Sequence, residues 1–143
     1  MKLIKTVPLL ISVIAQIAAQ TFAADRYSSD QQAAEMVIRS QLEAFQAGDT
    51  QTAYDYAAPS IKKIFPDVEQ FMSMVRSSYQ PVYSPQSVMF MDYIGDHSPP
   101  LQHVIIVGPK GNAWDVYYSM SQVGDGNWKI AGVHMFNRDE SAI

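Results

Sequence analysis

Apolar residues between positions 30 and 47 recur at steps of three and four, which is the period of one buried face of an α-helix. Ser29 and Gln32 have the spacing of a capping box, and Gly48 occupies a position where helices commonly end. The pattern therefore predicts a first helix over residues 30–47, whose buried face consists of Ala34, Val37, Ile38, Leu42 and Phe45.

Two shorter helices are predicted next. A capping residue at position 49 or 50 begins a helix over residues 51–58, and residues 60–65 add one further turn. Asp67 and Gln70 again have capping spacing, and apolar residues up to position 75 supply the buried face of a third helix. The prolines at positions 81 and 85 predict that helical structure ends there, because proline lacks the amide hydrogen that a helix interior needs.

From residue 87 onward, β-forming runs alternate with clusters of turn residues such as glycine, proline and asparagine. Strands that are joined by short turns pair in the antiparallel direction. The sequence therefore predicts an α+β fold in which three N-terminal helices pack on a curved four-stranded antiparallel sheet. The predicted strands cover residues 87–94, 103–107, 113–123 and 128–136, with turns at 95–100, 109–112 and 124–127.

Strict alternation along these strands assigns each side chain to one of two faces of the sheet. His134 and Phe136 share the parity of Ile130, so both are expected on the inward face of the last strand. Asp92 shares the parity of its apolar neighbours in the first strand and is expected to point inward as well. The inward residues of the third strand are Trp114, Val116, Tyr118 and Met120.

The first 23 residues have the pattern of a secretory signal peptide. Lysines at positions 2 and 5 precede an apolar run over residues 7–15, and small residues follow at positions 21 and 23. The run is far shorter than the roughly 20 residues that a membrane-spanning helix needs. We therefore expect cleavage after Ala23 or one residue later, with an uncleaved anchor as the alternative. The mature protein, a single domain over residues 24–143, would then be periplasmic or secreted from a bacterial cell.

Composition excludes several classes of function. The 143 residues are 48% hydrophobic, which suits one domain with its own core. The net charge of −4 becomes −6 when the two lysines of the signal peptide are lost, and so acidic a protein does not fit a nucleic-acid binder. The chain contains no cysteine, which excludes disulfides, thiolate metal sites, a cysteine nucleophile and attachment of a lipid to a cysteine.

Several short segments also carry a family resemblance. They include Gln-Leu-Glu-Ala-Phe at residues 41–45, Ala-Pro-Ser at 58–60, Phe-Met-Ser-Met-Val at 71–75, Tyr-Gln-Pro-Val-Tyr at 79–83 and Asp-Gly-Asn-Trp at 125–128. These segments resemble a family of uncharacterised bacterial exported proteins, domain of unknown function 4864.

That family is similar to the nuclear transport factor 2-like superfamily, which has a cystatin-like fold and includes ketosteroid isomerases and dehydratases. The resemblance implies a cone-shaped domain, in which a curved sheet wraps around the helices and leaves a cavity at its open end. No activity is assigned to the family, so the resemblance implies no catalytic residue.

The leading hypothesis is a non-enzymatic module that binds a small apolar or amphipathic ligand, or a protein partner. The eight tyrosines of the chain suit this role, because each combines an apolar ring with one hydroxyl group. We expect no cofactor. The candidate pocket residues are Tyr93, Trp114, Tyr118, Met120, His134 and Phe136.

Three alternatives remain open. An isomerase or dehydratase would use His134 or Asp92 as a general base, although no Ser-His-Asp or metal-ligand spacing accompanies either residue. A copper protein would use the thioethers of Met89 and Met91, which lie about 6.6 Å apart on one face of a regular strand. A homodimer would form through the sheet face that carries Tyr117.

Overall fold

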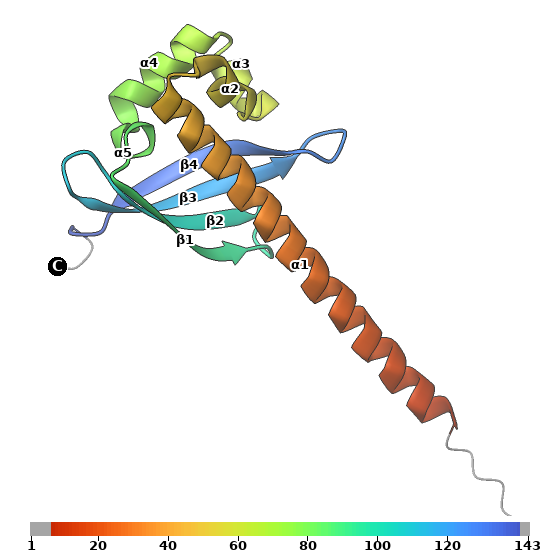
Figure 1. Ribbon diagram of the computed structural model, residues 1–143. Helices are drawn as coiled ribbons and strands as arrows, with labels where there is room; N and C mark the ends of the chain where they lie inside the picture. Colours follow the sequence, from red (N-terminus) through yellow and green to blue (C-terminus); the bar gives the residue numbers. More distant parts are fainter. Residues whose placement is uncertain (1–6, 141–143) are drawn as a thin grey trace, which may run out of the picture. The chain divides into compact units, whose positions relative to one another are not determined.

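The computed structural model describes residues 7–140, which form five helices followed by a four-stranded sheet (Figure 1). All neighbouring strands pair in the antiparallel direction, and their order in the open sheet is their order in the chain. The predicted α+β class and the four antiparallel strands are therefore confirmed. The elements are α1 (Val7–Ala47), α2 (Thr50–Asp55), α3 (Pro59–Ile64), α4 (Val68–Ser78), α5 (Gln80–Tyr83), β1 (Ser87–Ile94), β2 (Leu101–Val107), β3 (Ala113–Gln122) and β4 (Trp128–Asn137).

The first helix is longer than predicted. It begins at Val7 rather than at residue 30, and no glycine or proline interrupts residues 9–47. Continued backbone hydrogen bonding therefore overrides the capping pattern at Ser29. Among the described residues, no helix combines the length and the apolar character of a membrane span. The predicted charged start of the signal peptide, at positions 2 and 5, lies outside the described residues.

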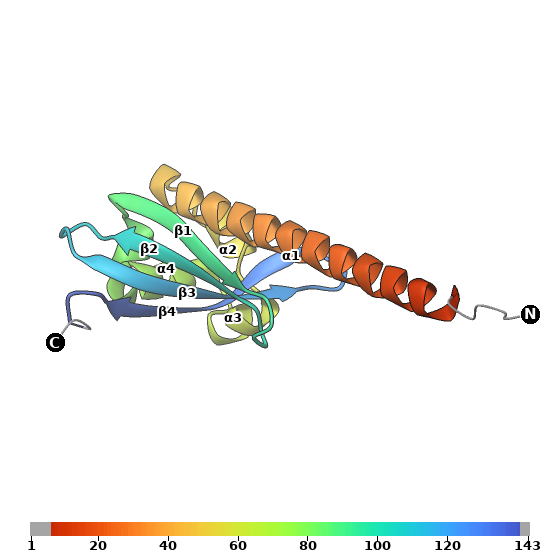
Figure 2. The same ribbon diagram turned by 90° about the horizontal axis from the view of Figure 1, so that it is seen from below.

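The chain divides into two compact units, Met1–Asp30 and Gln31–Ile143. The second unit contains the later part of α1 and all other elements. Its core lies between helices and one face of the sheet, which we call the inner face; the opposite face is the outer face (Figure 2). Alternate residues of β2, from Gln102 to Ile106, are fully buried on the inner face. The α1 residues predicted to face the core, Ala34, Ile38, Leu42 and Phe45, are buried in it, with Val37 partly buried against it.

The short helices differ from the prediction in number. A capping aspartate begins both α2 and α4: Asp49 accepts a hydrogen bond from the Thr52 amide at 3.2 Å, and Asp67 accepts one from the Gln70 amide at 2.8 Å. Helix α5, however, contains Pro81, where we expected helical structure to end. Proline is tolerated there because the first turn of a helix leaves its amide groups unbonded in any case.

A β-bulge in β1 overturns the predicted position of Asp92. The register with β2 shifts between Phe90 and Tyr93, so two residues of β1 lie opposite one residue of β2. The extra residue reverses the alternation that follows it. Tyr93 is consequently buried at 5% exposure, and Asp92 is exposed rather than inward.

A second bulge has the same effect in β4. Ser119 pairs with Gly132 and Met120 pairs with Ile130, which leaves Ala131 as the extra residue. Beyond it, Val133 and Met135 pack against the core, while His134 is exposed. The prediction that His134 and Phe136 point inward is therefore wrong, because it assumed an unbroken alternation from Ile130.

Candidate functional site

A pocket of about 530 Å³ lies within the second unit, where the short helices meet β4. Helix α1 contributes its last buried residues, and α3 and α4 supply most of the apolar wall. The remaining wall is formed by β4 itself, from Ile130 to His134. Its principal apolar side chains are Phe45, Ile61, Phe65, Phe71, Val75 and Val82.

Aromatic rings pack against one another on the helical side of this pocket. Phe45 lies 6.4 Å from Phe71 in a stacked arrangement, and the Tyr54 ring contacts Phe71 at 5.3 Å. The Tyr54 hydroxyl donates a hydrogen bond to the Phe65 carbonyl at 2.7 Å, which ties α2 to the end of α3. Aromatic contacts therefore connect α1, α2 and α4 on the helical side of the pocket.

Few polar groups line the pocket. Gln41 is buried and donates its side-chain amide to the Ala53 carbonyl at 3.0 Å. The Tyr79 hydroxyl donates to the Val133 carbonyl at 3.5 Å, and Ser78 and His134 complete the polar lining. No Lys, Arg, Asp or Glu is among the lining residues. The pocket therefore suits a neutral, mainly apolar group better than a charged one.

The pocket lies in a different place from the one predicted. Tyr93, Tyr118 and Met120 are buried core residues and do not line it. Trp114 is half-buried and borders a separate pocket of about 100 Å³, and Phe136 is 55% exposed on the outer face. Of the six predicted pocket residues, His134 alone borders the main pocket, and it does so from the edge of the sheet with an exposed side chain.

The residues that the sequence reasoning missed are those of α3 and α4. Ile61, Ile64 and Met74 are apolar residues on short helices, which is the only signal that the sequence carries for them, because their incomplete burial is visible in the structure alone. Ile64 is 67% exposed at the rim of the pocket. Exposed apolar residues around a concave surface are typical of a binding site.

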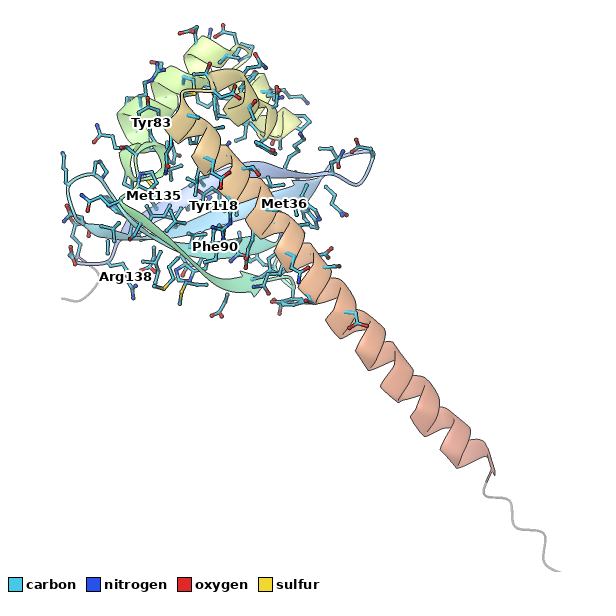
Figure 3. The ribbon with its side chains drawn as sticks, viewed as in Figure 1. Met36, Tyr83, Phe90, Tyr118, Met135 and Arg138 are labelled. Atoms are coloured by element: carbon cyan, nitrogen blue, oxygen red, sulfur yellow. The ribbon has the colours of Figure 1, made fainter. Side chains whose placement is uncertain are left out.

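Two buried polar atoms lie on the inner face away from the pocket lining. Gln102 and Tyr118 are paired across β2 and β3, and both are fully buried. The Gln102 Oε1 atom and the Tyr118 hydroxyl have no hydrogen-bond partner among the described residues. Burial raises the pKa of Tyr118, which projects from β3 into the interior (Figure 3). The hydroxyl therefore remains protonated throughout the physiological range.

The outer face, in contrast, carries a cluster of polar and aromatic side chains that contact one another. His103 Nε2 lies 2.7 Å from Asp115 Oδ1, and Arg138 Nε lies 3.3 Å from Asp115 Oδ2. The His103 ring stacks on Tyr117 at 4.6 Å, and Tyr117 meets Phe136 edge-on at 6.1 Å. These contacts pair the charge of Asp115 on the outer face.

The geometry gives little support to metal binding. Within residues 7–140, no three His, Cys, Asp or Glu side chains form a group able to hold a metal ion. Met89 is 60% exposed, and Met91 lies in the β1 bulge, where regular alternation is interrupted. His97 is exposed, and its Nδ1 atom contacts the Pro99 carbonyl in the turn after β1.

These features define a class of protein: an α+β domain with an open antiparallel sheet and an apolar pocket beside its last strand. The sequence-family model for DUF4864, a domain of unknown function, matches residues 27–143. The chain therefore belongs to that family. No curated protein and no solved structure shows significant similarity to it.

Proposed function

We propose that this protein is a non-enzymatic binding module that takes an apolar or amphipathic ligand in the pocket beside β4. The observation that carries the proposal is a pocket of about 530 Å³ whose lining includes no charged carboxylate, ammonium or guanidinium group. That volume lies within the range typical of ligand pockets, and transfer of an apolar group from water into such a site is favourable.

The polar lining supports orientation of the ligand rather than catalysis. Gln41 and Tyr79 are each engaged with a backbone carbonyl, and such fixed polar groups favour one ligand orientation over others. A general base needs a second polar group within reach of the same substrate. Asp92 does not line the pocket, and the His134 side chain is exposed, so the isomerase or dehydratase alternative has the weaker support.

Export belongs to the same proposal and rests on the pattern of residues 1–23. A signal peptide would be removed from the first of the two compact units, and the pocket lies wholly in the second. Intact mass of the protein recovered from the periplasm tests this directly. A chain that begins at Ala24 or Asp25 supports export, whereas absence of the protein from both the periplasm and the culture medium contradicts it.

We also propose that the family is a branch of the nuclear transport factor 2-like superfamily. The proposal is supported by the order of the elements, with a long helix and short helices ahead of a four-stranded antiparallel sheet. A crystal structure whose sheet wraps around α1 as a closed cone would support the assignment, and a flat sheet would contradict it.

Ligand binding is tested with the neutral fluorophore N-phenylnaphthylamine, whose emission rises in an apolar site. Ser78 is an exposed residue at the rim of the pocket, so Ser78→Trp places an indole across the opening. Ser77→Trp is the matched control, because Ser77 is the adjacent exposed residue and does not line the pocket. We expect weaker binding in Ser78→Trp alone. Equal affinities of the two variants, or no binding by the wild-type protein, would contradict the proposed function.

Self-association through the outer face is a second candidate role. Phe136 is 55% exposed beside the Tyr117 ring, and aromatic residues are enriched in protein interfaces. Sedimentation of wild-type protein, Phe136→Asp and the control Met36→Asp, which alters another exposed apolar residue, tests this role. A dimer that only Phe136→Asp dissociates supports it, and a monomeric wild type contradicts it.

A further inference from the structure

Strand β4 borders the pocket with its backbone as well as its side chains. It is an edge strand, because the sheet order places β3 on one side of it and no strand on the other. Arg138 N donates to Ala113 O at 3.0 Å, so from Gly132 onward the even-numbered residues of β4 are the ones whose backbone groups bond to β3. Val133 and Met135 are odd-numbered, so their N–H and C=O groups point away from β3. The contact between the Tyr79 hydroxyl and the Val133 carbonyl agrees with this direction.

The same edge already accepts an extended segment at its beginning. Ile130 N donates to Tyr56 O at 2.9 Å, and Ala58 N donates to Ile130 O at 2.8 Å, so Ala57 forms a parallel bridge with Ile130. The chain then turns into α3 and leaves the edge. Beyond this point, the N–H of Val133 and both backbone groups of Met135 have no partner across the edge among residues 7–140.

The pocket lies directly beside this unpaired length of edge. Residues from Ala131 to His134 form one wall, and apolar residues of α3 and α4, such as Ile61 and Val75, form the other. A backbone that approached this edge would find hydrogen-bond donors and acceptors at the spacing of a strand. Its alternate side chains would point to the inner-face side, where the apolar pocket lies.

We propose that the occupant of the pocket is an extended peptide segment of a partner protein, with apolar side chains at alternate positions, which pairs with the β4 edge as a fifth strand. The inference rests on the proposed function and names the ligand class of that site. A lipid carboxylate or phosphate is less well matched, because no Lys or Arg lines the pocket. A peptide satisfies both features together: the backbone groups pair with the edge, and its apolar side chains fill the pocket.

The test uses a blocked heptapeptide with leucine at its second, fourth and sixth positions and threonine elsewhere. Two isomers carry three N-methyl groups each: one on the amides of the leucines at positions two, four and six, the other on the amides of the threonines at positions three, five and seven. In an extended strand, alternate amides point to opposite edges, so only one isomer loses its bonds to β4. We expect the two isomers to differ in Kd by about tenfold or more, as the loss of two net hydrogen bonds implies. Isomers of equal affinity would overturn the proposal.

Amide hydrogen exchange locates the contact. The peptide is expected to slow exchange at Val133 and Met135, and protection confined to β1, the other edge strand, would overturn the proposal. If N-phenylnaphthylamine binds and the heptapeptide does not, the pocket binds apolar ligands and the peptide proposal fails alone. If neither binds, the proposed function fails with it. Protection of the same amides that depends on protein concentration without peptide would identify a second copy of this chain as the occupant, which also overturns the proposal.

Discussion

The side-chain amide of Gln102 in β2 donates a hydrogen bond to the backbone carbonyl of Met91 in β1, at 3.0 Å, where β1 contains its extra residue. The same nitrogen lies 2.9 Å from the His103 carbonyl. A bulge interrupts the ladder and leaves backbone groups without their regular partners. The buried glutamine supplies a partner at that point, which explains why a polar residue occupies a buried position on the inner face.

Gln102→Leu is therefore expected to destabilise the protein by about 1–3 kcal/mol, because the Met91 carbonyl loses its side-chain partner. Urea unfolding with an unchanged slope measures the difference. Gln122→Leu is the control, since Gln122 is an exposed glutamine of the same sheet. It should lie within about 0.5 kcal/mol of the wild type. Equal stability of both variants would show that the bulge does not depend on Gln102.

Tyr118→Phe, in contrast, is expected to stabilise the protein. The Tyr118 hydroxyl is fully buried and has no partner within the described part of the chain, so its removal eliminates a desolvation penalty and leaves the ring in place. We expect a gain of about 1 kcal/mol in the free energy of unfolding. A loss of similar size would show instead that the hydroxyl forms a stabilising hydrogen bond.

The raised pKa of Tyr118 gives stability a defined dependence on pH. Burial disfavours the phenolate, so the folded protein keeps the proton at a pH where the unfolded chain, with an ordinary pKa of about 10, releases it. The free energy of unfolding is unaffected by this group below that pH and falls as the pH rises through it. Between pH 10 and 11, wild type should lose about 1 kcal/mol more than Tyr118→Phe. Parallel curves for the two proteins would contradict the assignment.

Phe45→Ala should destabilise the protein by about 3–5 kcal/mol. The side chain is 4% exposed and contacts the rings of Phe71 and Tyr83, so truncation leaves a cavity beside the pocket. Phe136→Ala removes an equal volume from the outer face, where the side chain is 55% exposed. Its effect should be far smaller than that of Phe45→Ala. Thermal unfolding that ranks the two variants in the reverse order would contradict the assigned core.

Asp67→Ala should lower stability by about 1 kcal/mol, because the carboxylate accepts a hydrogen bond from the Gln70 amide at the start of α4. Since α4 forms one wall of the pocket, the same change should also weaken binding of N-phenylnaphthylamine. Asp67→Asn keeps the acceptor and serves as the control. A loss of stability in Asp67→Asn equal to that in Asp67→Ala would assign the effect to charge rather than to capping.

Local patterns in the sequence were sufficient for much of the fold. The spacing from Ala34 to Phe45 predicted the helix face that reaches the core, and the glycine and proline clusters predicted the turns that separate the strands. The cap at Asp67 was also predicted, because it depends on residues only three positions apart. Each of these features depends on contacts within a few residues, and such contacts can be read from one stretch of chain.

The candidate site depended on contacts that no local pattern contains. His134 and Asp92 were placed on the wrong face because a bulge is determined by the register with the neighbouring strand. The pocket combines Phe45, residues of α3 and α4, and the edge of β4, which lie far apart in the chain. The sequence by itself determined the four strands, the order of helices before strands and most of the core, since these follow from periodicity and from turn residues. Tertiary structure alone decided which face each residue after a bulge occupies and where the pocket opens, since both follow from pairing between distant segments.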